Sequence, residues 1–128
     1  MTQKFSTPIE LRFCDLDAYG HVNSSVYFTY LETARVKLFH DFFREVSEHG
    51  IFTLVARAEC DYKIPILLYD RVVVTCWIAK TGRSSFELEY QIHDDQGKTY
   101  ATARTTMVCF DSINNKTVAI PEIIKAMA

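Results

Sequence analysis

The sequence predicts an α+β fold in which one antiparallel sheet covers one long helix. Between Gly20 and Gly50, apolar residues recur at three- and four-residue steps, which is the only long helical pattern in the chain. After Gly50 the pattern changes to short runs with strand character, and residues 85–93 alternate between apolar and polar side chains. A helix and a sheet that are each apolar on one side bury those sides against each other, so the two patterns together predict this class.

The helix is expected to begin near Asn23 or Ser24, either of which can cap it, and to end at Gly50. About 24 residues would span about 36 Å at ~1.5 Å per residue. Phe28 and Val36 broaden its apolar face, which favours a helix enclosed on several sides. The residues that set the helical period are Val26, Tyr27, Tyr30, Leu31, Ala34, Leu38, Phe39, Phe42 and Phe43.

Strands are expected before and after this helix, about five in all. Residues 94–97 have the composition of a hairpin turn, and residues 81–83 form the turn before it. Pro121 is expected to open a short terminal helix that ends at Met127. The expected strands cover residues 5–14, 53–63, 71–80, 85–93 and 99–110.

Length and composition predict one globular domain spanning residues 1–128. The chain is 48% hydrophobic and 23% charged, which excludes a disordered protein. Its net charge is −2 and it has no basic tract, which argues against a nucleic-acid partner. Residues 1–8 lack the apolar core of a signal peptide, and no run approaches the ~18 apolar residues of a membrane span. We therefore expect a cytoplasmic protein with no membrane partner.

The cysteines are expected to be buried, reduced thiols in strand-like runs. They are widely spaced, and none forms a C-x-x-C pair or a Cys/His ligand cluster. Disulfides and zinc ligands are the less favoured alternatives, so neither a metal nor a cofactor is expected. The four residues are Cys14, Cys60, Cys76 and Cys109.

Residues 12–35 carry a motif that is specific in combination. A strand ends in the pattern D-x-D-x-x-G-H-V-N, a tyrosine follows at the helix start, and E-x-A-R follows inside the helix. The residues that form it are Asp15, Asp17, Gly20, His21, Val22, Asn23, Tyr27, Glu32, Ala34 and Arg35. With this motif the chain resembles the 4-hydroxybenzoyl-CoA thioesterase family, and a looser similarity extends through residues 82–85 and the final hairpin.

The resemblance implies a hotdog fold, in which a curled sheet surrounds the central helix. It also implies a homodimer whose two sheets join edge to edge, often paired again into a tetramer, with active sites at the dimer interface. The implied reaction is hydrolysis of an acyl-CoA thioester without a cofactor. Asp17 matches the family's catalytic carboxylate, whereas Asp15 is expected to have a structural role in the turn or cap.

The chemistry of the residues agrees with this reaction. Thioester hydrolysis needs a nucleophile or base at the carbonyl carbon and hydrogen-bond donors at the developing oxyanion. Asp17, just before the turn at Gly20, can supply the carboxylate. The unpaired N–H groups of the helix start, at Val22, Asn23 and Ser24, can supply the donors. The sequence leaves open whether Asp17 attacks directly or deprotonates a water molecule.

Three further motif residues are candidates for substrate contact, and each has a structural alternative. Gly20 can allow close approach of the substrate or simply provide a backbone conformation that other residues avoid. His21 can bind substrate or orient the loop, and Tyr27 can line the acyl pocket or fill the core. Glu32 and Arg35 have i,i+3 spacing and are expected to form a structural ion pair.

The turn around Arg83 is the expected site for the CoA phosphates. Lys80 and Arg83 offer positive charge, and Ser84 and Ser85 offer hydrogen-bond donors. Lys63 is a weaker candidate for the same role. The alternative is a solvated basic hairpin with no ligand.

Two rival functions remain for the same fold. One is a non-catalytic module that binds acyl-CoA or an acyl-carrier protein, against which the retained Asp17 argues. The other is a hydratase or dehydratase acting on enoyl thioesters, for which the motif lacks a His/Glu or Asp/His pair. Ser24 replaces a second Asn found in many relatives, which bears on substrate preference. Aromatic, short and long aliphatic acyl groups are all compatible with the sequence.

Overall fold

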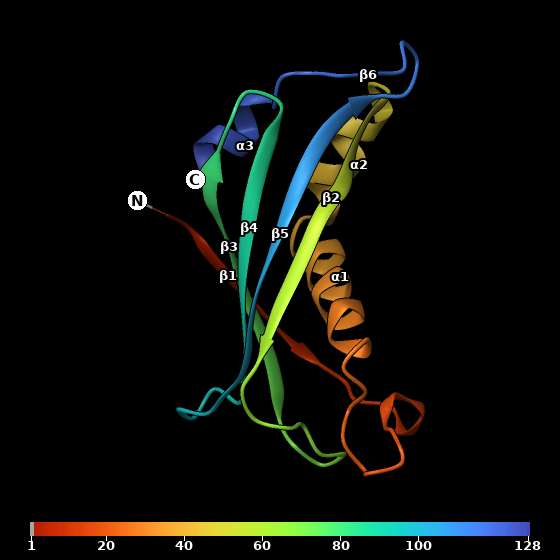
Figure 1. The fold of residues 1–128 in the computed structure, drawn as a ribbon. Coiled ribbons are helices and arrows are strands. Elements are labelled where there is room, and N and C mark those ends of the chain that lie inside the picture. The colour runs from red at the N-terminus through yellow and green to blue at the C-terminus, as the bar shows by residue number, and fades with distance from the viewer. Residues whose placement is uncertain (1) are drawn as a thin grey trace.

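The computed structural model describes residues 2–128 and confirms the α+β class. Within this range a six-stranded antiparallel sheet has the order β1-β3-β4-β5-β2, and β6 pairs with β5. Figure 1 shows α1 and α2 running along one face of the curled sheet. The elements are β1 (Lys4–Ile9), the 3-10 helix η1 (Phe13–Asp15), α1 (Val26–Leu38), α2 (His40–Glu48), β2 (Ile51–Tyr62), β3 (Val72–Thr81), β4 (Ser85–His93), β5 (Thr99–Asp111), β6 (Lys116–Thr117) and α3 (Glu122–Met127).

The core lies between the concave face of the sheet and the two longer helices. β4 spans the predicted residues 85–93 and shows the predicted alternation, because every second side chain is buried. The buried side chains of this strand are Phe86, Leu88, Tyr90 and Ile92. Burying each such side chain contributes about 1.5–3 kcal/mol, which makes this strand a main source of fold stability.

The predicted single helix is present as two, and the break lies at Phe39. The backbone leaves helical geometry there (φ −117°, ψ 17°), although the N–H of Phe39 still donates to the carbonyl of Arg35. The Phe39 ring is buried and packs edge-on against Phe5 of β1, with ring centroids 5.2 Å apart. We attribute the bend to this contact, since a straight helix of about 36 Å would lose contact with a curled sheet at one of its ends.

The helix is also less enclosed than expected. Only one side of α1 is buried, while Val36 on the opposite side is 52% exposed. The first strand is shorter than the predicted residues 5–14 and ends at Ile9. Residues 13–15 form η1 instead, and this change leaves Cys14 exposed. Cys76 and Cys109 are buried free thiols as predicted, whereas Cys60 on the edge strand β2 is only partly buried.

β2 is an edge strand, paired with β5 on one side and unpaired on the other. Gly50 adopts a left-handed conformation (φ +77°) that turns the chain out of α2 and into β2. Much of β2 is exposed, including Phe52, Leu54, Val55 and Tyr62. The unpaired edge therefore presents free backbone groups together with apolar side chains.

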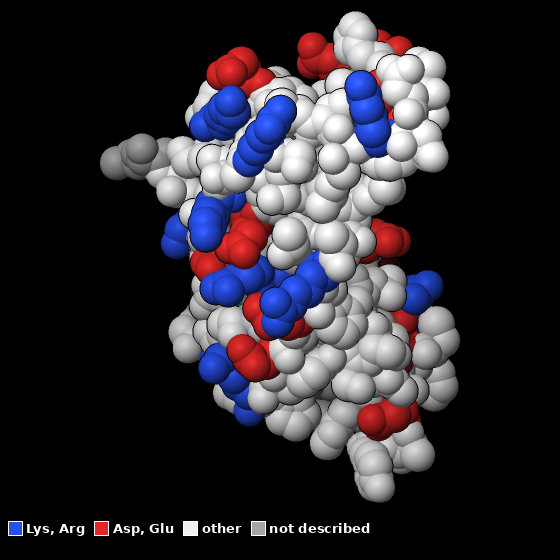
Figure 2. Space-filling model, turned by 45° about the horizontal axis from the view of Figure 1, so that its top comes forward, with Lys and Arg blue, Asp and Glu red and all other residues white. Residues whose placement is uncertain are grey.

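The outer face of the sheet is polar, and its charges are mixed. Figure 2 shows basic and acidic side chains interspersed across the visible face. On the sheet, Arg104 pairs with Glu89 of β4 at 2.9 Å and with Glu59 of β2 at 3.7 Å. None of the helices within residues 2–128 has the length and apolar character that a membrane crossing requires.

Candidate active site

Asp17 lies in a tight turn between η1 and α1. Its N–H donates to the carbonyl of His21 at 2.7 Å, and the N–H of Gly20 donates to the carbonyl of Asp17 at 3.1 Å. Gly20 has φ +76°, a conformation that side-chain-bearing residues rarely adopt, so glycine is needed for the turn itself.

One oxygen of the Asp17 carboxylate accepts hydrogen bonds from the turn, and the other is available. Oδ1 accepts the N–H groups of Tyr19 at 2.9 Å and His21 at 3.2 Å. Among residues 2–128, Oδ2 has no hydrogen-bond partner. The turn thus fixes the orientation of the side chain and leaves one oxygen for a substrate or a water molecule.

Asp15 anchors this turn from the inside. It is almost fully buried, and its carboxylate accepts hydrogen bonds from the Arg12 side chain (2.8 and 3.1 Å), the Arg12 N–H (3.1 Å) and the Tyr30 hydroxyl (2.8 Å). Burial alone would raise the pKa of Asp15, but the hydrogen bonds from Arg12 and Tyr30 outweigh it and lower the pKa below its ordinary value. Burial, followed by the contact with Asp15, raises the pKa of the Tyr30 hydroxyl.

The start of α1 differs from the prediction and narrows the set of oxyanion donors. The helix begins at Val26, and the N–H groups of Val22 and Asn23 are already bonded to the carbonyls of Ile66 (2.9 Å) and Asp15 (2.8 Å). The Asn23 side chain accepts the N–H of the next-but-one residue, Ser25, at 3.0 Å.

Ser24 is the one predicted oxyanion donor whose N–H is still available. Its N–H has no hydrogen-bond partner within the described part of the chain. Its carbonyl accepts the Tyr62 hydroxyl at 2.7 Å. That bond ties the start of α1 to the end of β2.

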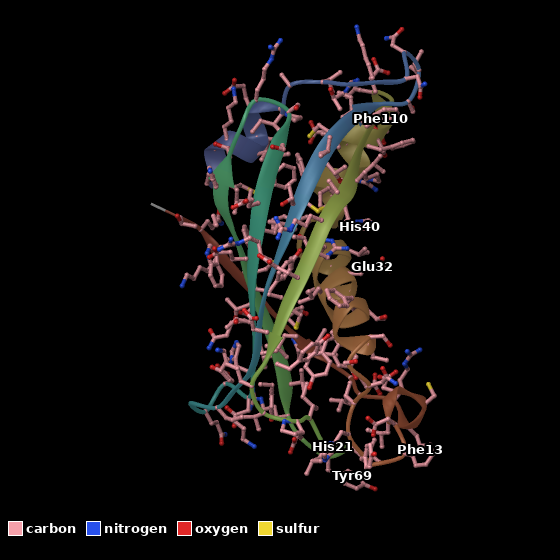
Figure 3. All side chains as sticks on the ribbon, viewed as in Figure 1. Phe13, His21, Glu32, His40, Tyr69 and Phe110 are labelled. Carbon is pink, nitrogen blue, oxygen red and sulfur yellow. The ribbon has the colours of Figure 1, made fainter. Side chains whose placement is uncertain are left out.

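A cavity of about 370 Å³ brings most of the predicted site together. It is lined by Asp17, His21, Val22, Asn23, Ser24, Tyr27, Tyr62, Lys63, Ile64 and Pro65. Gly20 shapes the adjoining turn but does not line the cavity. Figure 3 shows His21 at the same end of the molecule as Phe13 and Tyr69.

The far wall of this cavity, at the end of β2, was missed by sequence reasoning. Tyr62 packs edge-on against Tyr27, with ring centroids 4.7 Å apart, and burial raises the pKa of its hydroxyl. Ile64 and Pro65 follow in the next loop. Their position depends on β2 lying beside the start of α1, a long-range contact without a local sequence signal.

The predicted CoA-phosphate turn lies at the opposite end of the molecule. Lys80 and Arg83 flank the turn between β3 and β4, and the ten residues of β3 separate them from the Asp17 end by about 30 Å. The carbonyls of Arg83 and Ser84 accept the N–H groups of Ile120 (2.8 Å) and Cys109 (3.0 Å), so the turn is held both to the segment before α3 and to β5, and Ser85 begins β4. Of the predicted CoA contacts, only Lys63 lies in the Asp17 cavity.

A second cavity, of about 660 Å³, lies beside the other half of β2, between that strand and the helices. It is lined by Glu32, Arg35, Val36, His40, Phe43, Arg44, Ser47, Ile51, Phe52, Thr53, Leu54, Val55 and Met107. The predicted Glu32–Arg35 ion pair is absent from the described residues. Arg35 is turned inward to the Tyr90 hydroxyl at 3.2 Å, whereas Glu32 is exposed. Within residues 2–128 no cluster of His, Cys, Asp or Glu is suited to hold a metal ion.

A curled antiparallel sheet over a central helix is the hotdog fold, and thioesterases of known structure share it. Residues 11–127 match the family model of the thioesterase-like superfamily, and the chain belongs to that family.

The long-chain acyl-CoA thioesterase FadM of Escherichia coli is 30% identical over 89% of this chain and 89% of its own length. The 1,4-dihydroxy-2-naphthoyl-CoA hydrolase of Thermosynechococcus vestitus is 27% identical over 91% of this chain and 82% of its own. A Thermus thermophilus thioesterase, solved in complex with coenzyme A and Zn, superposes with a TM-score of 0.80 at 33% identity. That match covers 95% of this chain and 89% of the other.

Proposed function

We propose that the protein hydrolyses acyl-CoA thioesters, with the Asp17 carboxylate as nucleophile or general base. The observation that carries this proposal is the single cavity lined by both Asp17 and Ser24. There, one free carboxylate oxygen and one unpaired N–H group border the same space. Two relatives named as acyl-CoA hydrolases and a related structure that contains coenzyme A support the substrate class.

Two reaction routes fit this arrangement. In the first, Oδ2 of Asp17 attacks the thioester carbonyl carbon, and collapse of the tetrahedral intermediate releases the CoA thiolate and leaves a mixed anhydride, which water then hydrolyses. In the second, Asp17 takes a proton from water as the water attacks, and the thiolate leaves directly. In both routes the oxyanion develops on the carbonyl oxygen, where the Ser24 N–H is the proposed donor.

The proposed assembly is a homodimer joined through the free edge of β2, with tetramers formed from two such dimers. Full antiparallel pairing of β2 with a second copy sets Ile51 opposite Tyr62. The Asp17 cavity of one copy then adjoins the larger cavity of the other, because Tyr62 borders the first and Ile51 the second. Pairing would satisfy the backbone N–H and C=O groups that the β2 edge leaves free.

The twofold symmetry of this proposed dimer also determines which basic residues can reach CoA. Antiparallel pairing brings the β3–β4 turn of one copy to the end of the dimer that holds Asp17 of the other. Lys80, Arg83 and the neighbouring serines are therefore proposed to reach CoA only across the dimer, whereas Lys63 reaches it within one copy. Light scattering checks the assembly, and a monomer at micromolar concentration would exclude it.

The decisive test of the proposed chemistry is Asp17→Asn. We expect kcat for CoA thiol release to fall at least ~10²-fold while the far-UV circular dichroism and the Tm stay close to those of the wild type. Asp41→Asn is the matched control, because Asp41 is an exposed carboxylate on α2, and it should leave the rate unchanged. A near-wild-type rate in Asp17→Asn would remove Asp17 from the mechanism.

The substrate panel should contain short, long and aromatic acyl-CoAs. Ligand-induced stabilisation without thiol release from any of them would favour a non-catalytic binding module. Release from one acyl class would identify the acyl group that the cavity accepts.

A further inference from the structure

Arg35 is a buried cation without an anionic partner. Its residue surface is only 8% exposed, and no Asp or Glu oxygen lies within 4.0 Å of its guanidinium nitrogens among residues 2–128. Of the five N–H donors of a guanidinium, one is bonded, from Nη1 to the Tyr90 hydroxyl at 3.2 Å. Buried charges are normally paired, because leaving one unpaired costs several kcal/mol.

The unbonded donors are not fully enclosed, and their residue borders the larger cavity. Within the described chain, every fully enclosed side-chain nitrogen or oxygen has a hydrogen-bond partner, so Nε and Nη2 of Arg35 must retain some accessible surface. Arg35 lines the 660 Å³ cavity between the helices and β2. On the other side, the Tyr90 hydroxyl lies 2.7 Å from Thr105 Oγ1, which holds the guanidinium against the sheet.

The rest of the cavity is mostly apolar. Its volume of about 660 Å³ is within the range of small-molecule sites, roughly 300–1,000 Å³. A wholly apolar ligand would leave the guanidinium unpaired, and a small inorganic anion would leave most of the apolar wall uncovered. Besides Arg35, the charged side chains that line it are Glu32 and Arg44. The apolar side chains along it are Val36, Phe43, Ile51, Phe52, Leu54, Val55 and Met107.

We propose that this cavity binds carboxylates that carry an apolar chain, with the carboxylate on Arg35 and the chain along the apolar wall. The planar guanidinium offers paired N–H groups that match the two oxygens of a carboxylate. The binding itself does not depend on turnover at Asp17. If the proposed function holds, ligands of this chemistry come from two sources, the free acid released by hydrolysis and an acyl group whose far end carries a carboxylate.

The test compares ligands that share an apolar chain and differ in charge. Isothermal titration calorimetry with decanoate and with 1-decanol is expected to show at least ~10-fold tighter binding of decanoate to the wild type. Arg35→Gln should abolish this preference. Arg71→Gln, which removes an exposed guanidinium elsewhere, should retain it. Equal affinity of the wild type for the two ligands would overturn the proposal without recourse to any variant.

Four further measurements separate this proposal from the proposed function and from a role of Arg35 in assembly. Asp17→Asn should bind decanoate as the wild type does, so loss of hydrolysis and loss of this site are independent outcomes. Inhibition of turnover by decanoate that Arg35→Gln relieves would identify the free acid as the ligand. A loss of kcat/KM in Arg35→Gln for the mono-CoA thioester of decanedioic acid, without a loss for decanoyl-CoA, would identify the acyl group as the ligand. A shift in the monomer–dimer equilibrium of Arg35→Gln, without charge preference in the wild type, would assign Arg35 to a carboxylate of a second copy and exclude the site.

Discussion

Each end of β2 borders a cavity, and a charged side chain of opposite sign is fixed in place at each one. At the Tyr62 end a carboxylate, Asp17, sits at the surface and is held by backbone N–H groups. At the Ile51 end a guanidinium, Arg35, sits inside the protein and is held by one hydroxyl. The first charge is partly exposed and oriented by its turn, whereas the second is buried with a single hydrogen bond within the described chain. If both proposals hold, the cavity at one end of β2 serves the reaction and the cavity at the other end serves ligand selection.

The largest effect on this contrast is expected from Asp15→Asn. The buried carboxylate accepts four hydrogen bonds from N–H and O–H donors, two of which come from the Arg12 side chain, and the amide cannot accept them all. We expect a loss of about 2–4 kcal/mol in the free energy of unfolding, measured by urea titration. The loosened turn should also lower kcat, since it carries Asp17. Decanoate binding at Arg35 should be unaffected, and parallel loss at both sites would show that the two regions are not independent.

A smaller effect is expected from acidification. The folded-state pKa of Asp15 lies below its ordinary value, so its contribution to stability is complete above about pH 4, where the unfolded carboxyl is ionised, and is lost as the pH falls through the folded pKa. The stability difference between the wild type and Asp15→Asn should therefore shrink as the pH falls below about 4. Urea midpoints at pH 7, 4 and 3 would measure this, and a constant difference would contradict the assignment.

Local patterns were sufficient for most of the fold. The alternation in residues 85–93 predicts β4 because each strand residue faces one side of the sheet, whatever lies further away. The break at Phe39 could not be predicted in this way, since it follows from a contact with Phe5 in a distant strand.

The residues of the site also divide into those that local sequence predicts and those that only tertiary packing brings together. Asp17, the Gly20 turn and the helix start are close in sequence, so the motif was enough to group them. Tyr62 joins them only after β2 has taken its place beside α1. The i,i+3 spacing of Glu32 and Arg35 suggested an ion pair, but burial of Arg35 beside Tyr90 in β4 turns its side chain away from Glu32. Spacing shows which side chains are neighbours, and tertiary packing determines which of them meet.

The free edge of β2 also has a consequence for folding. An exposed apolar strand with unpaired backbone groups is a template on which other extended chains can aggregate. Its apolar half contains Phe52, Leu54 and Val55, but the half after the bulge carries Arg57, Glu59 and Asp61. These charges disfavour aggregation, because a chain paired in the wrong register would bury them without partners. The apolar half of the strand thus favours pairing with another strand, and the charged half disfavours it. Together they limit the strands with which the β2 edge can pair during folding.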